Sequence, residues 1–510
     1  MSNSAASKVL SELREYDREL QLLKHGCAVL QWDQETYMPP AAAEERAEQL
    51  GVFETLVHDR IADDRLGELL ELAGASPNNL LGSEDLPYRD RALIRLLFRE
   101  HLKARRVPRD LVGRLARAAS AGQTAWRAAR AEDDFAAFKP QLEELVALAQ
   151  ERAECLGYEE HPYDALLDQY EPHMTTAEVS RVFHELEQRL VPLVSRIAEA
   201  PQLDDTFLYR EFPEDIQETF GARVLREIGW PSNRGRLDIS THPFTIGLGR
   251  DDVRITTRYD RGFFNAAFFS MLHEAGHGLY ELGFADEIRG SMLADGTSLG
   301  IHESQSRFWE NVVGRSRAFW KRYYPALQGA FPTALAEIDS EAFYRAINKV
   351  RPSLIRVEAD EVTYSLHVIL RFRLETALFS GDLASAELPD AWREESRRLL
   401  GVVPESDAEG VLQDVHWSMG GFGYFPTYAL GNLFAAQFTE ALEAELGPLA
   451  PLLERGEFAE ILAWLRQRIH AHGSARTATE LVSDITGRNL EGEPFMRYLH
   501  AKFGEIYALD

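Results

Sequence analysis

Apolar residues recur at helical spacing along almost the whole chain, and this pattern limits the fold more than any other feature. In residues 7–24, for example, they fall mostly on one helix face, and the segment is expected to end near Gly26. With 510 residues, 45% of them hydrophobic, the chain can bury a large core in a mostly α fold. We predict helices at Ser7–Lys24, Ala41–Asp59, Leu66–Ala73, Tyr88–Arg105, Pro108–Glu132, Phe138–Leu156, Thr176–Glu199, Ile216–Ile228, Glu303–Tyr323, Ser340–Lys349, Glu361–Phe379, Asp390–Leu400, Leu430–Leu446 and Phe458–His472.

One region, residues 237–259, departs from the helical pattern. Within it, apolar or small residues at 253, 255 and 257 alternate with Arg254, Thr256 and Arg258, and a polar turn precedes them. A period of two is typical of a strand with one buried face. We predict a small antiparallel β-hairpin or sheet of two or three strands here, directly before the apolar segment that holds the sequence HEAGH.

The chain shows no internal repeat, low-complexity tract or Ser/Gly-rich linker. Such features mark the boundaries of arrays and tethered domains. We therefore predict a single domain over residues 1–510, with no sharp internal boundary.

Composition excludes several classes of protein. The chain has 55 Lys and Arg against 82 Asp and Glu, a formal net charge of −27, which argues against nucleic acid as a partner. The charged N-terminal segment lacks the apolar core of a signal peptide, and no apolar run is long enough to span a membrane. The two cysteines, Cys27 and Cys155, cannot form a disulfide framework. A cytoplasmic enzyme fits these observations best.

The sequence HEAGH predicts a metal site. His273 and His277 stand four residues apart, so a helix places both imidazoles on one face, where they can bind one Zn²⁺. Glu274 follows the first histidine and is placed to act as general base on a metal-activated water. The preceding segment is apolar nearly all round, as expected of a buried helix, whereas a chance HExxH match usually falls on an exposed one.

Glu303 is the best candidate for a third ligand. It follows His277 by 26 residues, enough for a loop and the start of a second helix to bring a carboxylate across. Taken alone, Glu303 is also explained as a charge favoured at a helix N-terminus. Glu281 is the alternative ligand, but it lies on the same helix as both histidines and cannot close the far side of the ion. For His302, a structural and a catalytic role both stay open.

Together, HEAGH and the downstream HESQS at 302–306 resemble the carboxypeptidase Taq family of metallocarboxypeptidases. The resemblance extends over nearly the whole chain. Its further motifs are WDQETYMPP at Trp32–Pro40, YDALLDQYEP at Tyr163–Pro172, HPF at His242–Phe244, DVRIT at Asp252–Thr256, IRVEAD at Ile355–Asp360 and GVLQDVHW at Gly410–Trp417.

The resemblance implies a fold and an activity. The fold is an elongated, mostly helical molecule in two lobes around a deep central groove, similar to that of the thimet-oligopeptidase-like peptidases. The activity is release of single C-terminal amino acids from peptides with broad specificity. One divalent ion per chain, Zn²⁺ or alternatively Co²⁺, and a homodimer are implied as well.

A carboxypeptidase has to recognise a free terminal carboxylate, which arginine can bind through two parallel hydrogen bonds. The candidates are Arg356, Arg254 and Arg351, and Arg356 comes first because its IRVEAD motif belongs to the family pattern. The alternative for Arg356 is an ion pair with Asp360, one helical turn further on.

Two side chains are candidates for stabilising the oxyanion of the transition state, His416 and Tyr424. The sequence GGFGYFPTYALG resembles the Gly/Tyr-rich loop of the wider oligopeptidase group, which favours Tyr424 over Tyr428. The predicted hairpin of Asp252–Tyr259 is expected to form one wall of the cleft, where an extended peptide would add as a strand.

Two other functions compete with this interpretation. An endo-acting metallo-oligopeptidase would share the metal site but need no carboxylate clamp. A non-catalytic helical binding protein with a structural metal predicts a closed site of four protein ligands. The sequence offers no convincing fourth ligand and no cysteine near HEAGH.

Overall fold

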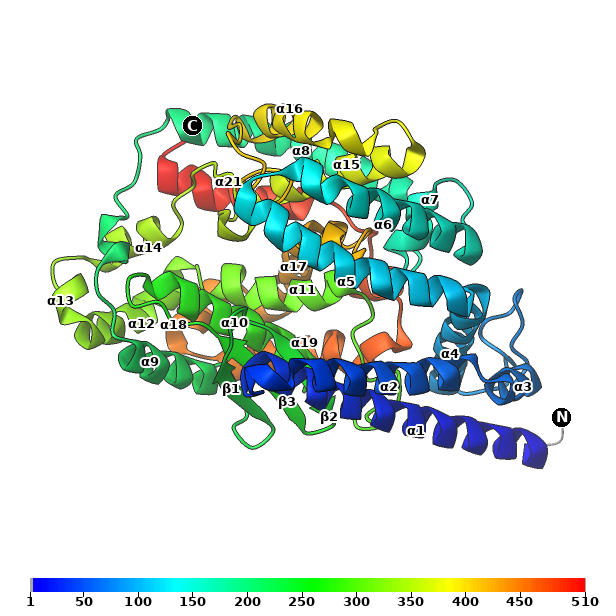
Figure 1. Ribbon diagram of the computed structural model, residues 1–510. Coiled ribbons are helices and arrows are strands. Elements are labelled where there is room, and N and C mark those ends of the chain that lie inside the picture. Colours follow the sequence, from blue (N-terminus) through cyan, green and yellow to red (C-terminus); the bar gives the residue numbers. More distant parts are fainter. Residues whose placement is uncertain (1–2, 510) are drawn as a thin grey trace.

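The computed structural model describes residues 3–509, with side chains from residue 7 onward. Helices make up most of the molecule and surround one small sheet, as predicted (Figure 1). The α-helices are α1 (Asn3–Thr36), α2 (Ala43–Ala62), α3 (Asp64–Leu72), α4 (Tyr88–Arg106), α5 (Arg109–Glu132), α6 (Phe135–Leu156), α7 (Pro162–Leu167), α8 (Thr176–Glu199), α9 (Glu214–Glu227), α10 (Phe264–Glu281), α11 (Leu299–Arg307), α12 (Arg317–Ala330), α13 (Pro332–Leu335), α14 (Ser340–Ile347), α15 (Tyr364–Ser380), α16 (Leu388–Leu400), α17 (Pro426–Leu446), α18 (Leu449–Arg455), α19 (Phe458–Arg468), α20 (Ala478–Thr486) and α21 (Glu493–Tyr507).

Shorter helical turns and three strands complete the described chain. The turns are η1 (Pro40–Ala42), η2 (Thr206–Tyr209), the π-helix η3 (Phe308–Val313), η4 (Arg356–Glu358), η5 (Ser385–Glu387), η6 (His416–Met419) and η7 (His470–Ala475). The strands are β1 (Gly235–Ile239), β2 (Thr245–Gly249) and β3 (Asp252–Thr257).

The sheet has the order β1-β3-β2. Strands β2 and β3 form the predicted antiparallel hairpin, but β1 runs parallel to β3, so the prediction of a purely antiparallel sheet was wrong. The reason lies in the segment 240–244, which crosses the end of β3 and places β2 on its far side. Thr256 holds this crossing segment, because its hydroxyl lies 2.6 Å from that of Ser240 and accepts from the Phe244 N–H at 2.9 Å.

The two faces of β3 contact different helices. Thr257 donates to the carbonyl of Ala267 in α10, and Ile255 lies on this same buried face. Arg254 points to the other face, where its guanidinium lies 4.2 Å from the ring centroid of Trp32 in α1. The sheet is therefore packed between α1 and the helix that carries HEAGH.

Helix α1 is longer than predicted, because the chain does not end the helix near Gly26. A Cβ at Gly26 would lie 3.1 Å from the ring of Phe53 in α2. The glycine thus allows two helices to pack closely, at the ordinary conformational cost of glycine inside a helix. The prediction that this glycine marks a helix end was wrong.

The predicted helix Glu303–Tyr323 is three segments in the structure. Helix α11 ends at Arg307, the π-helix η3 follows, and α12 begins at Arg317. Ser316 caps α12, since its side chain accepts from the Phe319 N–H at 3.2 Å. This break lies next to the candidate metal ligands and positions a further carboxylate there.

Helix α10 lies in the interior of the molecule (Figure 1), as its apolar sequence predicts. Phe264 and Phe268 stack on each other, and both rings also contact Trp320 of α12. Helices α9 and α11, strand β3 and the π-helix pack around it. Such dense packing fixes the orientation of the side chains that α10 presents.

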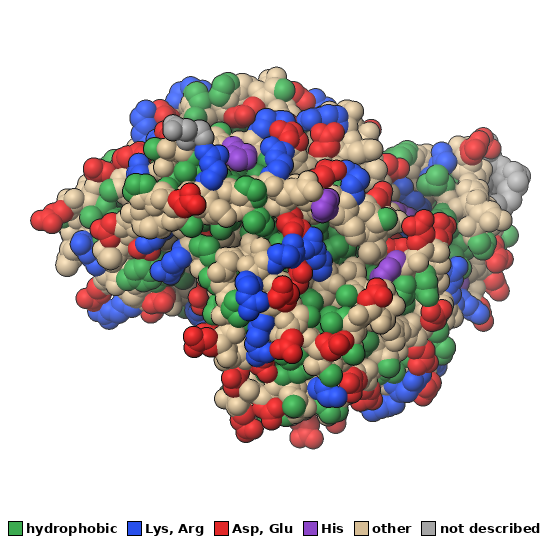
Figure 2. Space-filling view, turned by 90° about the horizontal axis from the view of Figure 1, so that it is seen from above, with side chains coloured by type: hydrophobic (Ala, Val, Ile, Leu, Met, Phe, Trp, Pro, Cys, Tyr) green, Lys and Arg blue, Asp and Glu red, His purple; other side chains and the backbone are tan. Residues whose placement is uncertain are grey.

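The surface carries charges of both signs. Figure 2 shows acidic and basic side chains interspersed over the face seen from above. Over the residues that the structure describes, none of the helices combines the length and the apolar character needed to cross a membrane.

Candidate metal centre

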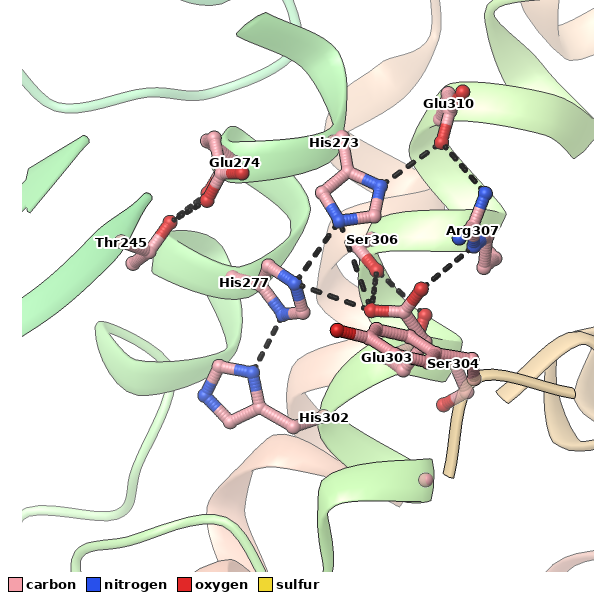
Figure 3. A network of polar contacts seen from close by, with 12 residues as sticks. Thr245, His273, Glu274, His277, His302, Glu303, Ser304, Ser306, Arg307 and Glu310 are labelled. Atoms are coloured by element: carbon pink, nitrogen blue, oxygen red, sulfur yellow. Dashed lines mark hydrogen bonds and ion pairs between the residues drawn. The ribbon is translucent and has the colours of Figure 1, made fainter. Parts of the chain in front are cut away.

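The side chains of His273, His277 and Glu303 converge on one point between α10 and α11 (Figure 3). His273 Nε2 lies 3.2 Å from His277 Nε2, and Glu303 Oε2 lies 3.6 Å and 3.4 Å from these two nitrogens. A tetrahedral Zn²⁺ with bonds of ~2.0–2.1 Å holds its ligand atoms about 3.3–3.4 Å apart. The donor set and the spacing of its atoms therefore fit a single divalent ion.

Two glycines allow the ligand-bearing helices to approach. A Cβ at Gly276 of α10 would collide with the carbonyl oxygen of Gln305 in α11. A Cβ at Gly431 of α17 would lie 2.5 Å from Cγ of Glu303. Helix α11 is thus held between α10 and α17. Glu303 therefore reaches the two histidines from within a helix, and no loop has to carry it there.

Glu310 and Arg307 surround the ligands on one side. The Nδ1 of His273 lies 2.9 Å from Oε2 of Glu310, so the histidine can donate there while its Nε2 faces the other ligands. Arg307 donates from Nε to Glu303 at 2.7 Å and from Nη1 to Glu310 at 3.3 Å. Metal-binding histidines are usually oriented by such a carboxylate.

The charges of this group set its protonation. Burial opposes ionisation, but Arg307 and His273 outweigh it and hold the pKa of Glu303 well below its usual range. Burial likewise opposes a charged His273, yet Glu303 and Glu310 raise the pKa of that imidazole to about 9. A divalent cation would take the place of the proton on His273.

His277 has a different partner. Its Nδ1 lies 2.5 Å from Nδ1 of His302, and Nε2 of His302 lies 3.3 Å from Glu281. Burial, followed by His302, lowers the pKa of His277 to about 3, so the imidazole is neutral, as a ligand must be. His302 therefore touches a ligand, and Glu281 reaches His302 rather than the three ligand atoms.

Glu274 lies beside His273 in the chain but points toward Thr245 of β2 (Figure 3). The Thr245 hydroxyl lies 2.6 Å from Oε2 of Glu274 and 2.9 Å from the Glu274 carbonyl. Burial raises the pKa of Glu274, although His273 and the bond to Thr245 lower it in part. The result is a buried carboxylate with a raised affinity for a proton.

The two candidate oxyanion donors lie together. The rings of His416 and Tyr424 are 5.2 Å apart, and Tyr428 lies 5.2 Å from Tyr424 and accepts or donates a hydrogen bond at 3.3 Å with His416 Nε2. Burial lowers the pKa of His416 to about 4. Burial, with Glu303 as the next cause, raises the pKa of Tyr424 to about 12. The electrostatic effect of Glu303 on Tyr424 connects this cluster to the metal ligands.

Arg356 is buried and paired with Asp414, not with Asp360, so the alternative ion pair was wrong. Its Nε and Nη2 donate to Asp414 Oδ1 at 3.0 and 2.8 Å, while its Nη1 donates to Tyr364 at 3.1 Å. Asp360 instead caps the start of its own turn, accepting from Thr363. The 3₁₀ turn η4 covers only Arg356–Glu358 and the chain is extended at Ala359, so the helical spacing assumed for the pair is absent.

The other two candidate arginines have other surroundings. Arg254 pairs with Asp252 at 2.9 and 2.8 Å, and it lies on the sheet face opposite α10. Arg351 is exposed in the loop before η4. The structure thus brings His416, Tyr424 and Arg356 into one region and leaves these two arginines outside it.

Sequence reasoning missed several residues of the centre. Arg307 and Glu310 follow Glu303 by four and seven residues, a helical spacing that was the available signal. Thr245 gave no signal and Asp414 appeared only within the motif GVLQDVHW, because both come from segments far from their partners.

Comparisons with known proteins extend these findings. The family model for carboxypeptidase Taq (M32) metallopeptidases matches residues 12–503. The thermostable carboxypeptidase 1 of Thermus thermophilus is 45% identical over 507 residues, covering 97% of this chain and 98% of that protein. Carboxypeptidase 1 of Bacillus subtilis is 38% identical over 506 residues, covering 98% of this chain and 100% of that protein.

Solved structures agree with the sequence relatives. The crystal structure of the M32 carboxypeptidase from Deinococcus radiodurans matches with a TM-score of 0.95 at 39% identity, covering 98% of this chain and 100% of that one. With its two histidines and one glutamate on adjoining helices, the chain belongs to the carboxypeptidase Taq (M32) metallopeptidase family and is a metal-dependent carboxypeptidase.

Proposed function

We propose that this carboxypeptidase holds one Zn²⁺ per chain on His273, His277 and Glu303, and releases single C-terminal amino acids with broad specificity. The observation that best supports this proposal is the spacing of the three ligand atoms. Nε2 of His273, Nε2 of His277 and Oε2 of Glu303 lie 3.2, 3.4 and 3.6 Å apart, which fits a tetrahedral ion. Co²⁺ suits the same donors and is the alternative ion. Among the described residues no fourth side chain joins this group, which favours a catalytic site over a closed structural one.

When bound, the ion supplies Lewis acidity, which acidifies water and polarises the scissile carbonyl. Glu274 is proposed as the general base, which takes a proton from the attacking water and later delivers it to the leaving amine. Its raised pKa suits this role, since a general base works best when its pKa lies nearer the working pH. The Thr245 hydroxyl holds the carboxylate in place.

Tyr424 and His416 are proposed to donate hydrogen bonds to the oxyanion. Burial keeps both side chains uncharged at neutral pH, because it raises the pKa of Tyr424 and lowers that of His416. Among the residues described, the buried Nδ1 of His416 has no hydrogen-bond partner. We rank Tyr424 first, because the charge of Glu303 acts on it.

Arg356 is proposed to bind the terminal carboxylate of the peptide. Its guanidinium lies 4.8 Å from the ring centroid of Tyr428, which in turn contacts Tyr424. Asp414 and Tyr364 fix the guanidinium, which lowers the entropy lost on binding a carboxylate. Arg254 and Arg351 rank lower as carboxylate-binding residues, because Arg254 pairs with Asp252 and Arg351 is exposed in a loop.

The structure contradicts the expectation that a substrate peptide pairs with Asp252–Tyr259. Strand β3 is the central strand and is paired on both edges, so Asp252–Tyr259 cannot take up a peptide strand. We propose instead that the peptide lies along the outer edge of β2, the strand that carries Thr245. The groove between two lobes that the family resemblance implies would run past this edge.

One experiment separates the three candidate functions. The protein is stripped with a chelator, reloaded with Zn²⁺ or Co²⁺, and given a peptide and its C-terminally amidated twin. We expect turnover only after reloading. The enzyme should then release one amino acid from the peptide with a free C-terminus and should not cleave the amidated peptide. Equal cleavage of both twins would indicate an endo-acting oligopeptidase, and metal uptake without turnover would indicate a structural metal.

Two further expectations stay proposals. The family resemblance supports a homodimer, which sedimentation velocity would detect as twice the 57.7 kDa chain mass. Both cysteines are free in the structure, which supports a reducing, cytoplasmic location. Fractionation of the source cells would test the location.

A further inference from the structure

A cavity of about 600 Å³ lies among helices α1, α2, α4, α5 and α6. Cationic side chains dominate its charged lining, although the chain as a whole has a net charge of −27. Five cationic side chains face two acidic ones, Glu100 and Asp295. The cationic residues are Lys24, Arg95, Arg99, Lys103 and Arg152.

Some of these cations are already paired. Asp168 binds both Arg99 and Lys103 at 2.8 Å, and Arg95 lies 3.5 Å from Glu480. In the part of the chain described here, no carboxylate lies within 4.0 Å of the cationic groups of Lys24 or Arg152. Neither is held in an ion pair, although the charge of Lys24 acts on Asp295 in the same lining, and both can bind an incoming anion.

The titration of neighbouring groups is consistent with a positive field. Burial and then Arg99 lower the pKa of His173, which also lines the cavity. The same two causes lower the pKa of Lys103, despite the opposing charge of Asp168. The positive charges repel each other, and a bound anion would stabilise them.

The backbone at the cavity is also unusual. His173 has φ = +70°, a conformation that side-chain-bearing residues rarely adopt. Its N–H donates to Asp168 Oδ1 at 2.9 Å, which holds the turn. Strained positions of this kind concentrate at sites of function.

Two parts of the cavity wall lie close to the candidate metal centre. Its wall includes Gly296, where a Cβ would lie 2.8 Å from Cδ2 of His302, the neighbour of the ligand His277. It also includes Gln169, next to Tyr170, whose ring centroid lies 5.0 Å from that of Tyr424. One side chain thus separates the cavity from a metal ligand and from a candidate oxyanion donor.

Building on the carboxypeptidase reaction proposed above, we propose that this basic cavity binds acidic side chains of the substrate, on residues N-terminal to the scissile bond. An extended peptide advances about 3.3 Å per residue, so residues two to four positions before the bond span roughly 7–13 Å. Lys24 and Arg152 bind their carboxylates, and the enzyme prefers peptides with Glu or Asp in these positions.

The test uses the zinc-loaded enzyme and two N-acetylated hexapeptides. One carries Glu at the third, fourth and fifth positions from the C-terminus, and the other carries Gln there. We expect wild type to favour the Glu peptide in kcat/KM by at least about tenfold, as expected for one charge-assisted hydrogen bond. The double variant Lys24→Gln/Arg152→Gln should bring the ratio close to one.

A matched control removes two cations elsewhere on the same helices. Lys8 of α1 and Lys139 of α6 pair with Glu12 and Glu143 outside the cavity lining, so Lys8→Gln/Lys139→Gln should keep the preference. If both double variants lose the preference for the Glu peptide equally, its cause is long-range attraction and the proposal is wrong. A wild type without any preference for the Glu peptide would also overturn the proposal.

Two additional measurements separate other causes. An N-blocked dipeptide, too short to reach the cavity, reports on the metal centre, and its failure in wild type would count against the carboxypeptidase reaction itself. Calorimetry with inorganic phosphate tests for a free-anion site. Phosphate binding that Lys24→Gln/Arg152→Gln abolishes, without any preference between the hexapeptides, would overturn the assignment to substrate.

Discussion

Glu274 sits one residue from a ligand, yet its carboxylate is held by β2 and not by the ligand group. Replacing it with glutamine keeps the shape and the Thr245 contact but removes the proton acceptor. We expect Glu274→Gln to retain its metal and lose about 10²–10⁴-fold in kcat. Metal content and peptide turnover, measured on the same sample, check this.

The control for that variant is Glu287→Gln, an exposed carboxylate that pairs with Arg89 and lies outside the ligand group. It should keep most of its activity. Full turnover by metal-loaded Glu274→Gln would remove Glu274 from the mechanism.

Glu310 contacts His273 and lies outside the group of three proposed ligands. Its carboxylate accepts from Nδ1 of His273 at 2.9 Å. Glu310→Gln should lower the affinity for zinc by about 10–100-fold, because the histidine loses its carboxylate partner. Competition with a chromophoric chelator measures this affinity.

Glu341→Gln provides the matched comparison, since Glu341 pairs with Arg317 at the surface. Its zinc affinity should equal that of wild type. If Glu310→Gln also binds zinc as wild type does, the orienting role is wrong.

At the scale of residues, the sequence predicted what local spacing encodes. His273 and His277 share a helix face, and Glu303 lies in the middle of the next helix, so chemistry and spacing sufficed to predict that the three side chains lie together. The partner predicted for Arg356 was wrong, because Asp414 is 58 residues away in the sequence. Contacts of that range carry no periodic signal.

At the scale of elements, the distance between α10 and α11 decides whether a ligand group forms. Gly276→Ala would place a methyl group against the Gln305 carbonyl, closer than van der Waals contact allows, and push the helices apart. We expect a loss of about 1–3 kcal/mol in unfolding free energy together with weaker zinc binding. Urea unfolding of the metal-free protein and a chelator titration measure the two effects.

A glycine in open surroundings serves as the control. A Cβ at Gly329 in α12 would meet no atom within 4 Å, so Gly329→Ala should be neutral or stabilise the helix by about 0.5–1 kcal/mol. Equal stability of Gly276→Ala and wild type would show that the helix contact can relax.

Helix bounds were predictable where local signals agree. Helix α8 begins and ends where predicted, since a capping box at Thr175 marks its start. The parallel strand β1 was not predictable, because strand order depends on the crossing segment held by Thr256. The close packing of Gly26 on Phe53 was equally invisible, because it depends on tertiary structure.

At the scale of the whole molecule, Asp17 connects the start of the chain to its middle. The buried carboxyl of this α1 residue accepts from the N–H of Met292 at 2.9 Å. Burial raises the pKa of Asp17 to about 7, although the bond to Met292 lowers it in part. In the unfolded chain its pKa is near 3.9.

The sign of the pH effect follows from this difference. The folded state binds the Asp17 proton more tightly, so its stabilising contribution is complete below pH 4 and is lost as pH rises to 7. Asp17→Asn keeps an acceptor but cannot ionise. We expect the variant to gain stability relative to wild type between pH 4 and 7, by up to about 4 kcal/mol.

Urea unfolding of both proteins at several pH values checks the prediction. A difference in unfolding free energy that does not change between pH 4 and 7 would contradict it. Asp33→Asn, on the same helix and partly exposed in its ion pair with Arg46, is the comparison for the loss of a single α1 carboxylate.

The π-helix after α11 makes the geometry around His273 depend on the number of residues in this segment. Its wide turn accommodates an extra residue between Glu303 and Glu310, so the direction of the Glu310 carboxylate depends on the number of intervening residues. Deleting Phe308 or Trp309, which precede Glu310 in this segment, would rotate the Glu310 side chain about the helix axis by about 100°. Insertions and deletions should therefore be scarcer here than the identities of the residues alone would suggest.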